Sequence, residues 1–279
     1  MIKLLQKLLM PVFLAVFLFS TAMLLRQWKN NSSGESAYED AMKIALQSTE
    51  TRLPEQNSLP TVPAATEAEA SAVTYWVPVL VEDDPAMEEM EEIDIAALKE
   101  VNPDVLGWIR IPDTKIDYPL MQGEDNEFYL NHTWEKTVNS VGSIFLEHLN
   151  DPALTDYNTI VYGHNMGDGS MFAGLQSYAG QDFWETHPYV YIATEAAVYR
   201  YEVFAFYRAQ VDSLTYGMDI QRSETREEFL TLSLESSWID TGIHPELMDR
   251  ILTLSTCSGM NYSNRYVVQA RLPMVKVTK

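Results

Sequence analysis

Three side chains in the C-terminal two-thirds of the chain have types and spacing suited to acyl transfer. Cys257 is the only cysteine, and it follows the strand-like run 251–255 and precedes a polar loop. His164 follows the run 159–162, and the glycines around it let the backbone turn sharply. Arg265 comes eight residues after Cys257. It begins the next strand-like run, so we expect it to return close to the cysteine.

These residue types divide the work of acyl transfer between them. The thiolate attacks an amide carbonyl, and the imidazole protonates the leaving amine and later deprotonates the incoming nucleophile. The arginine, which is always charged, holds substrate carbonyls or the developing oxyanion. With ordinary pKa values near 8.5 for a thiol and 6.5 for an imidazole, the thiolate–imidazolium pair is only about 1% of the enzyme. We expect the site to run on that minor fraction, because a groove open to a peptide gives limited desolvation.

The cysteine and histidine content of the chain argues against a disulfide-stabilised fold and against a metal site. One cysteine excludes an intramolecular disulfide and any cysteine-rich metal site. The other histidines are scattered without ligand spacing, which argues against zinc, although His132 is placed to line a groove; they are His132, His148, His187 and His244. We assign no cofactor, and we interpret the six tryptophans and fifteen tyrosines as core and groove lining.

The net charge of the chain argues against one class of partner, the nucleic acids. The formal net charge is −21, of which −13 lies in residues 30–100. Such a chain is repelled by phosphate backbones, so nucleic-acid binding is unexpected.

The N-terminal 29 residues have the pattern of a membrane segment. Residues 8–25 carry no charge, with Lys3 and Lys7 before them and Arg26 and Lys29 after them. As a helix, these 18 residues span roughly 27 Å, close to the hydrocarbon core of about 30 Å. A cleaved signal peptide with its site at 20–22 is the alternative. We favour an uncleaved signal anchor at 1–29, because apolar residues continue to Leu25; either way, the rest of the chain is exported.

Residues 30–92 have the composition of an acidic, flexible stalk. A short helix is predicted at 36–52, followed by a segment rich in proline, alanine, serine and acids, and residues 82–94 hold eight acids and no base. Such a segment buries too little apolar surface to fold alone. We therefore place the start of the catalytic domain, 93–279, downstream of it.

Residues 93–279 alternate between apolar runs and turn residues. Strands are predicted at 105–111, 143–146, 159–162, 189–193, 198–211, 251–255 and 265–272. A short helix is predicted from 95, and another within 224–238. Many short strands with few helices favour a sandwich or a closed barrel.

The motifs around these residues resemble the sortases of Gram-positive bacteria. The signature consists of Thr253-Leu-Ser-Thr-Cys257, Arg265 and the upstream Gly163-His164. Further segments resemble class B sortases in particular; they are Asn102-Pro103-Asp-Val-Leu-Gly-Trp108-Ile-Arg-Ile-Pro112, Ile116-Asp-Tyr-Pro119, Tyr129-Leu-Asn131-His132, Gly142-Ser-Ile-Phe145 and Tyr162-Gly-His164-Asn-Met-Gly-Asp-Gly-Ser-Met-Phe172. Glu147-His148 departs from the pattern, where Asp and an aromatic residue are expected, and we interpret it as surface variation.

The resemblance implies a mainly β fold: a closed eight-stranded β-barrel with N-terminal helices and a helix inserted between late strands. It implies Cys257 as the nucleophile, His164 as the general acid/base and Arg265 as the oxyanion and substrate clamp. It also implies Ser255, Thr256 and Asn131 as substrate-binding residues, with the backbone N–H of Ser258 as a second oxyanion donor.

The implied reaction joins two partners at the cell surface. The enzyme cleaves a C-terminal sorting signal of a surface protein after a threonine, giving a thioester on Cys257. An amine of the cell-wall peptide or a pilin lysine then accepts the acyl group. The protein is expected in the cell membrane as a single-pass chain, with its catalytic domain extracellular. A hydrolytic cysteine peptidase and a catalytically inactive, membrane-tethered adhesion module are the rival functions.

Overall fold

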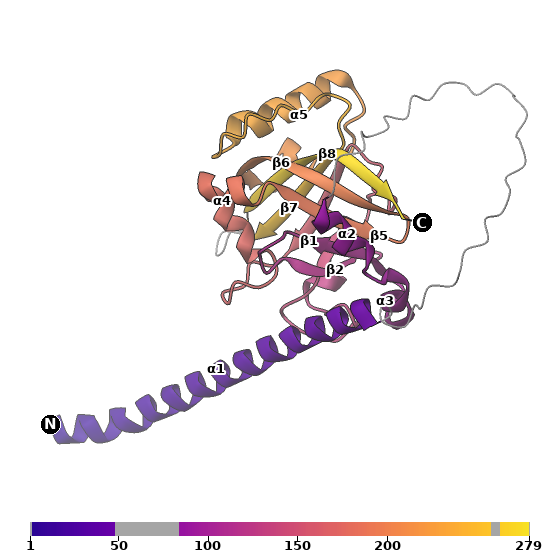
Figure 1. Cartoon of the computed structure of the whole chain (residues 1–279). Coiled ribbons are helices and arrows are strands. Elements are labelled where there is room, and N and C mark those ends of the chain that lie inside the picture. The colour runs from indigo at the N-terminus through magenta and orange to yellow at the C-terminus, as the bar shows by residue number, and fades with distance from the viewer. Residues whose placement is uncertain (1, 48–83, 258–262, 279) are drawn as a thin grey trace, which may run out of the picture.

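Eight strands form a closed barrel in the part of the chain that the structure describes. The structure is a computed structural model that describes residues 2–47, 84–257 and 263–278. The strands are β1 (Val105–Arg110), β2 (Asp117–Met121), β3 (Ile144–Leu146), β4 (Asn158–Gly163), β5 (Tyr189–Thr194), β6 (Ala197–Gln210), β7 (Ile251–Cys257) and β8 (Asn264–Val277). Their order around the barrel is β1-β2-β3-β4-β7-β8-β6-β5, and β5 closes on β1. The predicted barrel is therefore confirmed (Figure 1).

Two of the neighbouring pairs are parallel, and these pairs shape the site. Strand β2 runs parallel to β3, and β4 runs parallel to β7, whereas the other pairs are antiparallel. Parallel neighbours end at the same edge of a sheet, so β4 and β7 deliver the residues that follow them to one end of the barrel.

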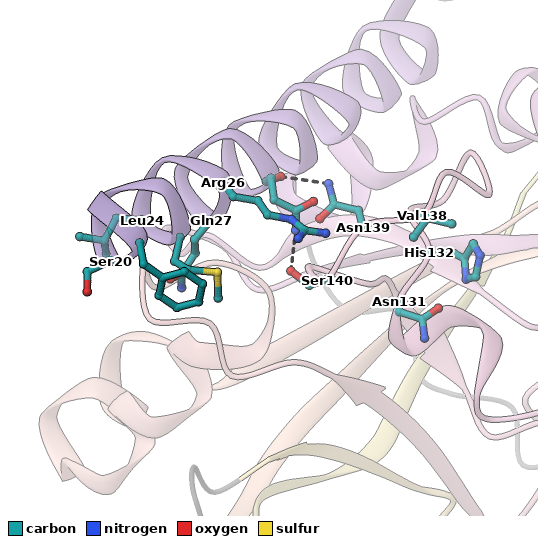
Figure 2. A pocket seen from close by; sticks show the side chains of 12 residues that line it. Ser20, Leu24, Arg26, Gln27, Asn131, His132, Val138, Asn139 and Ser140 are labelled. Atoms are coloured by element: carbon teal, nitrogen blue, oxygen red, sulfur yellow. Dashed lines mark hydrogen bonds between the residues drawn. The ribbon is translucent and has the colours of Figure 1, made fainter. Parts of the chain in front are cut away.

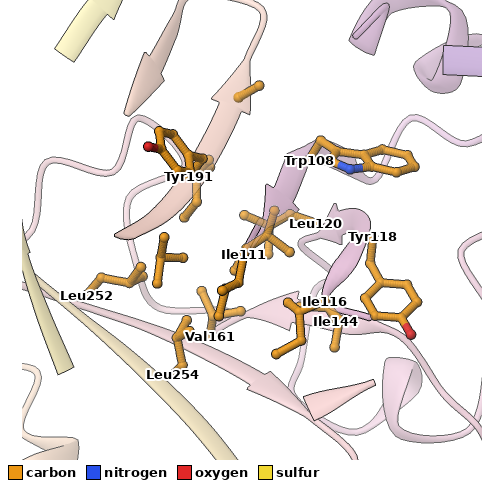
Figure 3. Close-up of a cluster of buried hydrophobic side chains, with 14 of the residues drawn as sticks. Trp108, Ile111, Ile116, Tyr118, Leu120, Ile144, Val161, Tyr191, Leu252 and Leu254 are labelled. Carbon is orange, nitrogen blue, oxygen red and sulfur yellow. The ribbon is translucent and has the colours of Figure 1, made fainter. Parts of the chain in front are cut away.

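The barrel is filled by large apolar side chains. Leu120, Ile144 and Leu254, each fully buried, come from three different strands and face the same interior (Figure 3). Strand β7 is buried on both faces, since residues 251–256 all lie below the surface. A buried strand gives the residue at its end a firm position.

The helix predicted within 224–238 is confirmed as α5 (Ser223–Ser236), which lies between β6 and β7 in the chain. Its Phe229 and Leu230 pack with Tyr157 and Phe204 in a second apolar cluster outside the barrel. The smaller helical elements are η1 (Phe128–Leu130), η2 (Phe172–Ala179), α4 (Gln181–Thr186) and η3 (Leu214–Tyr216).

The N-terminal helix is much longer than predicted. Helix α1 (Ile2–Gln47) runs without a break through the apolar segment and past the predicted boundary at residue 29. Its N-terminal part projects away from the barrel, and its C-terminal part lies against it (Figure 1). There Tyr38, Ala41 and Ala45 are buried in the main core.

The beginning of the predicted stalk thus needs correction, and so does its end. Helix α2 (Pro85–Glu91) buries Met87 and Met90, although both lie before the predicted domain start at 93. Helix α3 (Ile95–Val101) follows it, capped by Asp94, and the backbone N–H of Asp94 bonds to the Ala45 oxygen at 2.9 Å. The folded unit therefore includes the second half of α1 and all of α2. The rest of the predicted stalk, 48–83, lies outside the described residues, so its flexibility stays a prediction.

Candidate active site

The register of three strands brings the predicted catalytic positions together. In the antiparallel pair β7–β8, Cys257 is the register partner of Arg265. In the parallel pair β4–β7, Gly163 is the partner of Thr256. His164 follows Gly163 and Cys257 follows Thr256, so the two chains leave the sheet side by side. The position of His164 therefore meets those of Cys257 and Arg265, which lie far from it in sequence, at one end of the barrel.

His164 is held by the backbone of a neighbouring loop. Its Nε2 lies 2.5 Å from the carbonyl oxygen of Leu130. The ring also borders Gly142, because a Cβ built on that glycine would lie 2.9 Å from His164 Cδ2. Gly142 has φ +63°, a left-handed conformation that suits glycine. The close approach and the backbone angle together explain why this position has no side chain.

Helix α1 contacts the same loop from the other side. The Tyr38 hydroxyl donates to the carbonyl oxygen of Gly142 and lies 3.2 Å from Ser143 Oγ. At the adjacent residue of the helix, Trp134 Nε1 donates to the Ala37 oxygen at 2.8 Å. Burial raises the pKa of Tyr38 well above its ordinary value, so this hydroxyl stays protonated and remains a donor. No pattern in the sequence indicates this contact, because its two sides lie 104 residues apart.

The two residues before Cys257 are buried. Ser255 and Thr256 are each 1% exposed. The hydroxyls of Ser255 and Tyr216 lie 2.8 Å apart, whereas Thr256 Oγ1 has no hydrogen-bond partner among the described residues. Both side chains border the proposed nucleophile, and their role in substrate binding stays a prediction.

Glu147 is not the surface variation that the sequence suggested. It is only 7% exposed and accepts hydrogen bonds from Asn126 Nδ2 at 2.6 Å and from the Tyr162 hydroxyl at 2.9 Å. The cause is the pairing of β3 with β4, in which Phe145 is opposite Tyr162, so the chain beyond β3 stays beside that tyrosine. His148 Nδ1 also contacts the carboxylate, at 2.7 Å.

Tyr162 connects this carboxylate to the site. Burial and the Glu147 charge raise the pKa of Tyr162, and the Arg265 charge acts in the opposite direction. Tyr162 is also the register partner of Ser255. The sequence signal for Tyr162 is its place two residues before His164 in the class B-like motif.

The matches to known proteins agree with this geometry. A family model described as "Sortase domain" matches residues 109–273, which include all three predicted catalytic positions. The chain belongs to the sortase family. As in that family's enzymes, its expected activity is that of a cysteine transpeptidase.

The similar proteins are class B sortases. Sortase B of Listeria monocytogenes is 36% identical over 181 residues, which are 64% of this chain and 74% of that protein. Sortase B of Staphylococcus aureus is 33% identical over 178 residues, 63% of this chain and 73% of the relative. Among solved structures, a Staphylococcus aureus sortase B–substrate complex superposes with a TM-score of 0.61 at 32% identity, covering 64% of this chain and 83% of that one. Clostridium perfringens sortase B gives 0.60 at 34% identity, covering 64% and 99%.

The predicted substrate-binding residue Asn131 of this sortase lies apart from β7. Asn131 is exposed on the loop after η1, directly after Leu130, whose oxygen contacts His164. Its neighbour His132 stacks on Phe128 with ring centroids 3.9 Å apart. Ser258 lies outside the described residues, so its N–H as an oxyanion donor stays a prediction. Within the described part of the chain, no three His, Cys, Asp or Glu side chains gather closely enough to hold a metal ion.

Proposed function

We propose that this sortase cleaves a C-terminal sorting signal after a threonine and transfers the new acyl end to an amine. Cys257 attacks the threonine carbonyl and becomes acylated as a thioester, and His164 protonates the leaving amine. His164 then takes a proton from the incoming amine, which is a cell-wall peptide amine or a pilin lysine. Arg265 and the Ser258 N–H stabilise the oxyanion in both steps.

The observation that carries this proposal is the register of β4, β7 and β8. In that register Arg265, which is always charged, is the partner of Cys257, and His164 directly follows the adjoining parallel strand. Acyl transfer needs these three functions within reach of one carbonyl. The membership in a family of transpeptidases supports the same assignment.

The protonation states give the proposal a kinetic signature. If the enzyme runs on the minor thiolate–imidazolium fraction, the pH–rate profile is bell-shaped, with the thiol ionising above the histidine. Titration of the Cys257 thiol by its reaction rate with an alkylating agent tests this. Full ionisation already at about pH 6, well below the ordinary thiol value, would contradict it.

We also propose that α1 anchors the enzyme in the cell membrane with the catalytic domain outside the cell. A segment within Val12–Leu46 is long and apolar enough to cross a membrane, and its apolar side chains are exposed; examples are Phe13, Phe17 and Leu24. Lipid tails would cover these side chains in the bilayer. Protease accessibility of the catalytic domain on intact cells tests the orientation.

The activity test compares sorting peptides with and without an amine acceptor. The full chain, solubilised in detergent, is incubated with a library of C-terminal sorting peptides, and products are identified by mass. Transfer predicts an amide product that requires the amine, and Cys257→Ala abolishes it, while His244→Asn, at an exposed histidine away from the site, retains it as a histidine control. A hydrolytic product alone would support the peptidase alternative. No cleavage of any peptide would favour the inactive adhesion module.

A further inference from the structure

Helix α1 fixes the distance between the apolar span and the catalytic domain. The uncharged segment ends at Leu25, and Asn30 follows five residues later on the same continuous helix. At a rise of about 1.5 Å per residue, Asn30 lies roughly 7–8 Å above the end of the span. The headgroup layer on each side of the hydrocarbon core is about 5–7 Å thick. Asn30 therefore stands at the outer limit of the headgroup layer.

The catalytic domain already contacts the helix at this level. Asn30 Nδ2 donates to Ser140 Oγ at 2.5 Å, and its carbonyl oxygen accepts from Asn139 Nδ2 at 3.0 Å. One residue further on, Asn31 Nδ2 donates to Asp168 Oδ2 at 3.2 Å. Two loops thus meet the helix at the membrane surface, and one of them is the loop that follows His164.

Close packing above these contacts prevents the helix from swinging away. A Cβ on Gly34 would lie 2.8 Å from Val141 Cγ2, so the helix and the loop touch at a glycine. The Ala37–Trp134 hydrogen bond and the burial of Ala41 continue the contact along the next turns. The orientation of the domain relative to the helix axis is therefore set by packing.

A groove of about 950 Å³ lies between the helix and the loop that carries Asn131 and His132 (Figure 2). The side of the groove that the helix forms is apolar at one end and polar at the other. Phe19, Met23 and Leu24 belong to the apolar span, whereas Arg26 and Gln27 come after it. Across the groove the loop contributes mainly polar side chains and one apolar side chain at its rim, Val138, which is 75% exposed.

We propose that this face binds the phospholipids of the leaflet next to the catalytic domain. The groove has the amphipathic order of a phospholipid: acyl chain against Phe19 and Met23, phosphate beside the Arg26 guanidinium, and Val138 dipping into the headgroup layer. An exposed apolar residue and a cation that line one groove at this depth match a lipid surface better than they match bulk water. The inference rests on the membrane anchor proposed above, and it places the active-site loops at the membrane surface.

A depth measurement on the full chain tests the proposal without using its activity. In a Cys257→Ala background, Val138→Cys supplies a single labelling site for a fluorophore. The labelled protein is placed in phosphatidylglycerol nanodiscs, one copy per disc, that contain lipids with a nitroxide quencher on the headgroup. Met248→Cys is the matched control: Met248 is 79% exposed and contacts Arg226 of α5, and α5 lies on the other side of the barrel from α1 (Figure 1).

The proposal predicts a several-fold loss of fluorescence for the label at position 138 and no loss for the label at position 248. Insertion into discs with equal signals from both positions would overturn the proposal while leaving the anchor intact. Failure to co-elute with the discs would overturn both, and peptide transfer in detergent would still report separately on the proposed function. Quenching that is absent in these discs and appears only in a second preparation with two copies per disc would assign the groove to a second copy of the chain instead.

Discussion

The substitution Gly142→Ala tests whether the loop around Gly142 positions His164, and a matched control accounts for its effect on stability. The added Cβ would lie 2.7 Å from the Tyr129 oxygen, 2.8 Å from the Leu130 oxygen and 2.9 Å from His164 Cδ2. All three distances are shorter than a carbon atom tolerates. Because two of the neighbours are backbone atoms, the imidazole is the group that has room to move. We therefore expect the substitution to displace His164 from the Leu130 carbonyl.

A second glycine provides the matched control for this change. Gly242 has φ +65°, close to the +63° of Gly142, but a Cβ added there would meet nothing within 4 Å. Each substitution carries the left-handed penalty of roughly 1–2 kcal/mol. For a domain of this size that lowers Tm by about 2–4 °C per kcal/mol. Gly142→Ala adds an overpacking cost of about 1–3 kcal/mol, and a shift of about 1 Å in a catalytic group costs on the order of 10²-fold in rate.

The assay combines thermal unfolding with peptide-transfer kinetics for both variants. Gly242→Ala should lower Tm and leave kcat/KM unchanged. Gly142→Ala should lower Tm further and lower kcat/KM by about 10²-fold in protein that is still folded at the assay temperature. If the folded Gly142→Ala enzyme matched Gly242→Ala in kcat/KM, the reasoning that this loop positions His164 would be refuted.

Three further substitutions address the polar groups behind the site. Glu147→Gln should destabilise the fold by about 1.5–3 kcal/mol, measured by urea unfolding, because the Tyr162 hydroxyl loses a charged acceptor; an unchanged midpoint would contradict this. Tyr38→Phe should lower the free energy of unfolding by about 1 kcal/mol and should lower kcat more than it changes KM, because the hydrogen bond to Gly142 is lost. The control is Tyr201→Phe, whose buried hydroxyl has no partner among the described residues, and it should change neither the stability nor the kinetics. Equal effects of the two substitutions would oppose a role for α1. Burial raises the pKa of Tyr207 to about 12, so the folded state keeps a proton that the unfolded state releases above pH 10. Stability should therefore fall as pH rises from about 10 to 12, and this tyrosine contributes about 1.4 kcal/mol per pH unit to the fall. Tyr207→Phe should reduce the slope, measured by urea unfolding at each pH, by that contribution; the other buried tyrosines keep theirs.

Apolar periodicity was sufficient to predict most of the strands, whereas their closure into a barrel was implied only by the resemblance to sortases. The seven predicted strands are all present, with ends that differ by a few residues. Strand β2 was missed because Pro119 interrupts its pattern; in the structure, β3 pairs with β2 only from Leu120 onward. Strand β8 was predicted to end early for a similar reason. Pro273 lies where its register with β6 jumps from Arg271 to Met274, and the strand then continues.

Contacts between distant segments were the part that the sequence did not reveal. This part of α1 is polar except for a narrow stripe of small residues, Ala37, Ala41 and Ala45. Such a segment is predicted to be exposed to solvent when the partner surface that covers the stripe is unknown. The partner, around Trp134 and Val141, lies about a hundred residues away. Glu147 was misread for the same reason, because a carboxylate is expected at the surface until the Tyr162 hydroxyl that binds it is known.

The continuity of α1 changes the meaning of the predicted stalk. A flexible tether would let the catalytic domain sample many orientations, and the membrane would then have no effect on the active site beyond raising its local concentration. The structure instead connects the helix to the active site by direct contacts: the Tyr38 hydroxyl bonds to the Gly142 carbonyl oxygen, and Gly142 borders the His164 ring. Asn31, two turns nearer the span, bonds to the loop that follows the same histidine. Any tilt of the helix in the bilayer must therefore be shared by the loops that hold the general acid/base, so membrane attachment and catalytic geometry belong to one packed unit.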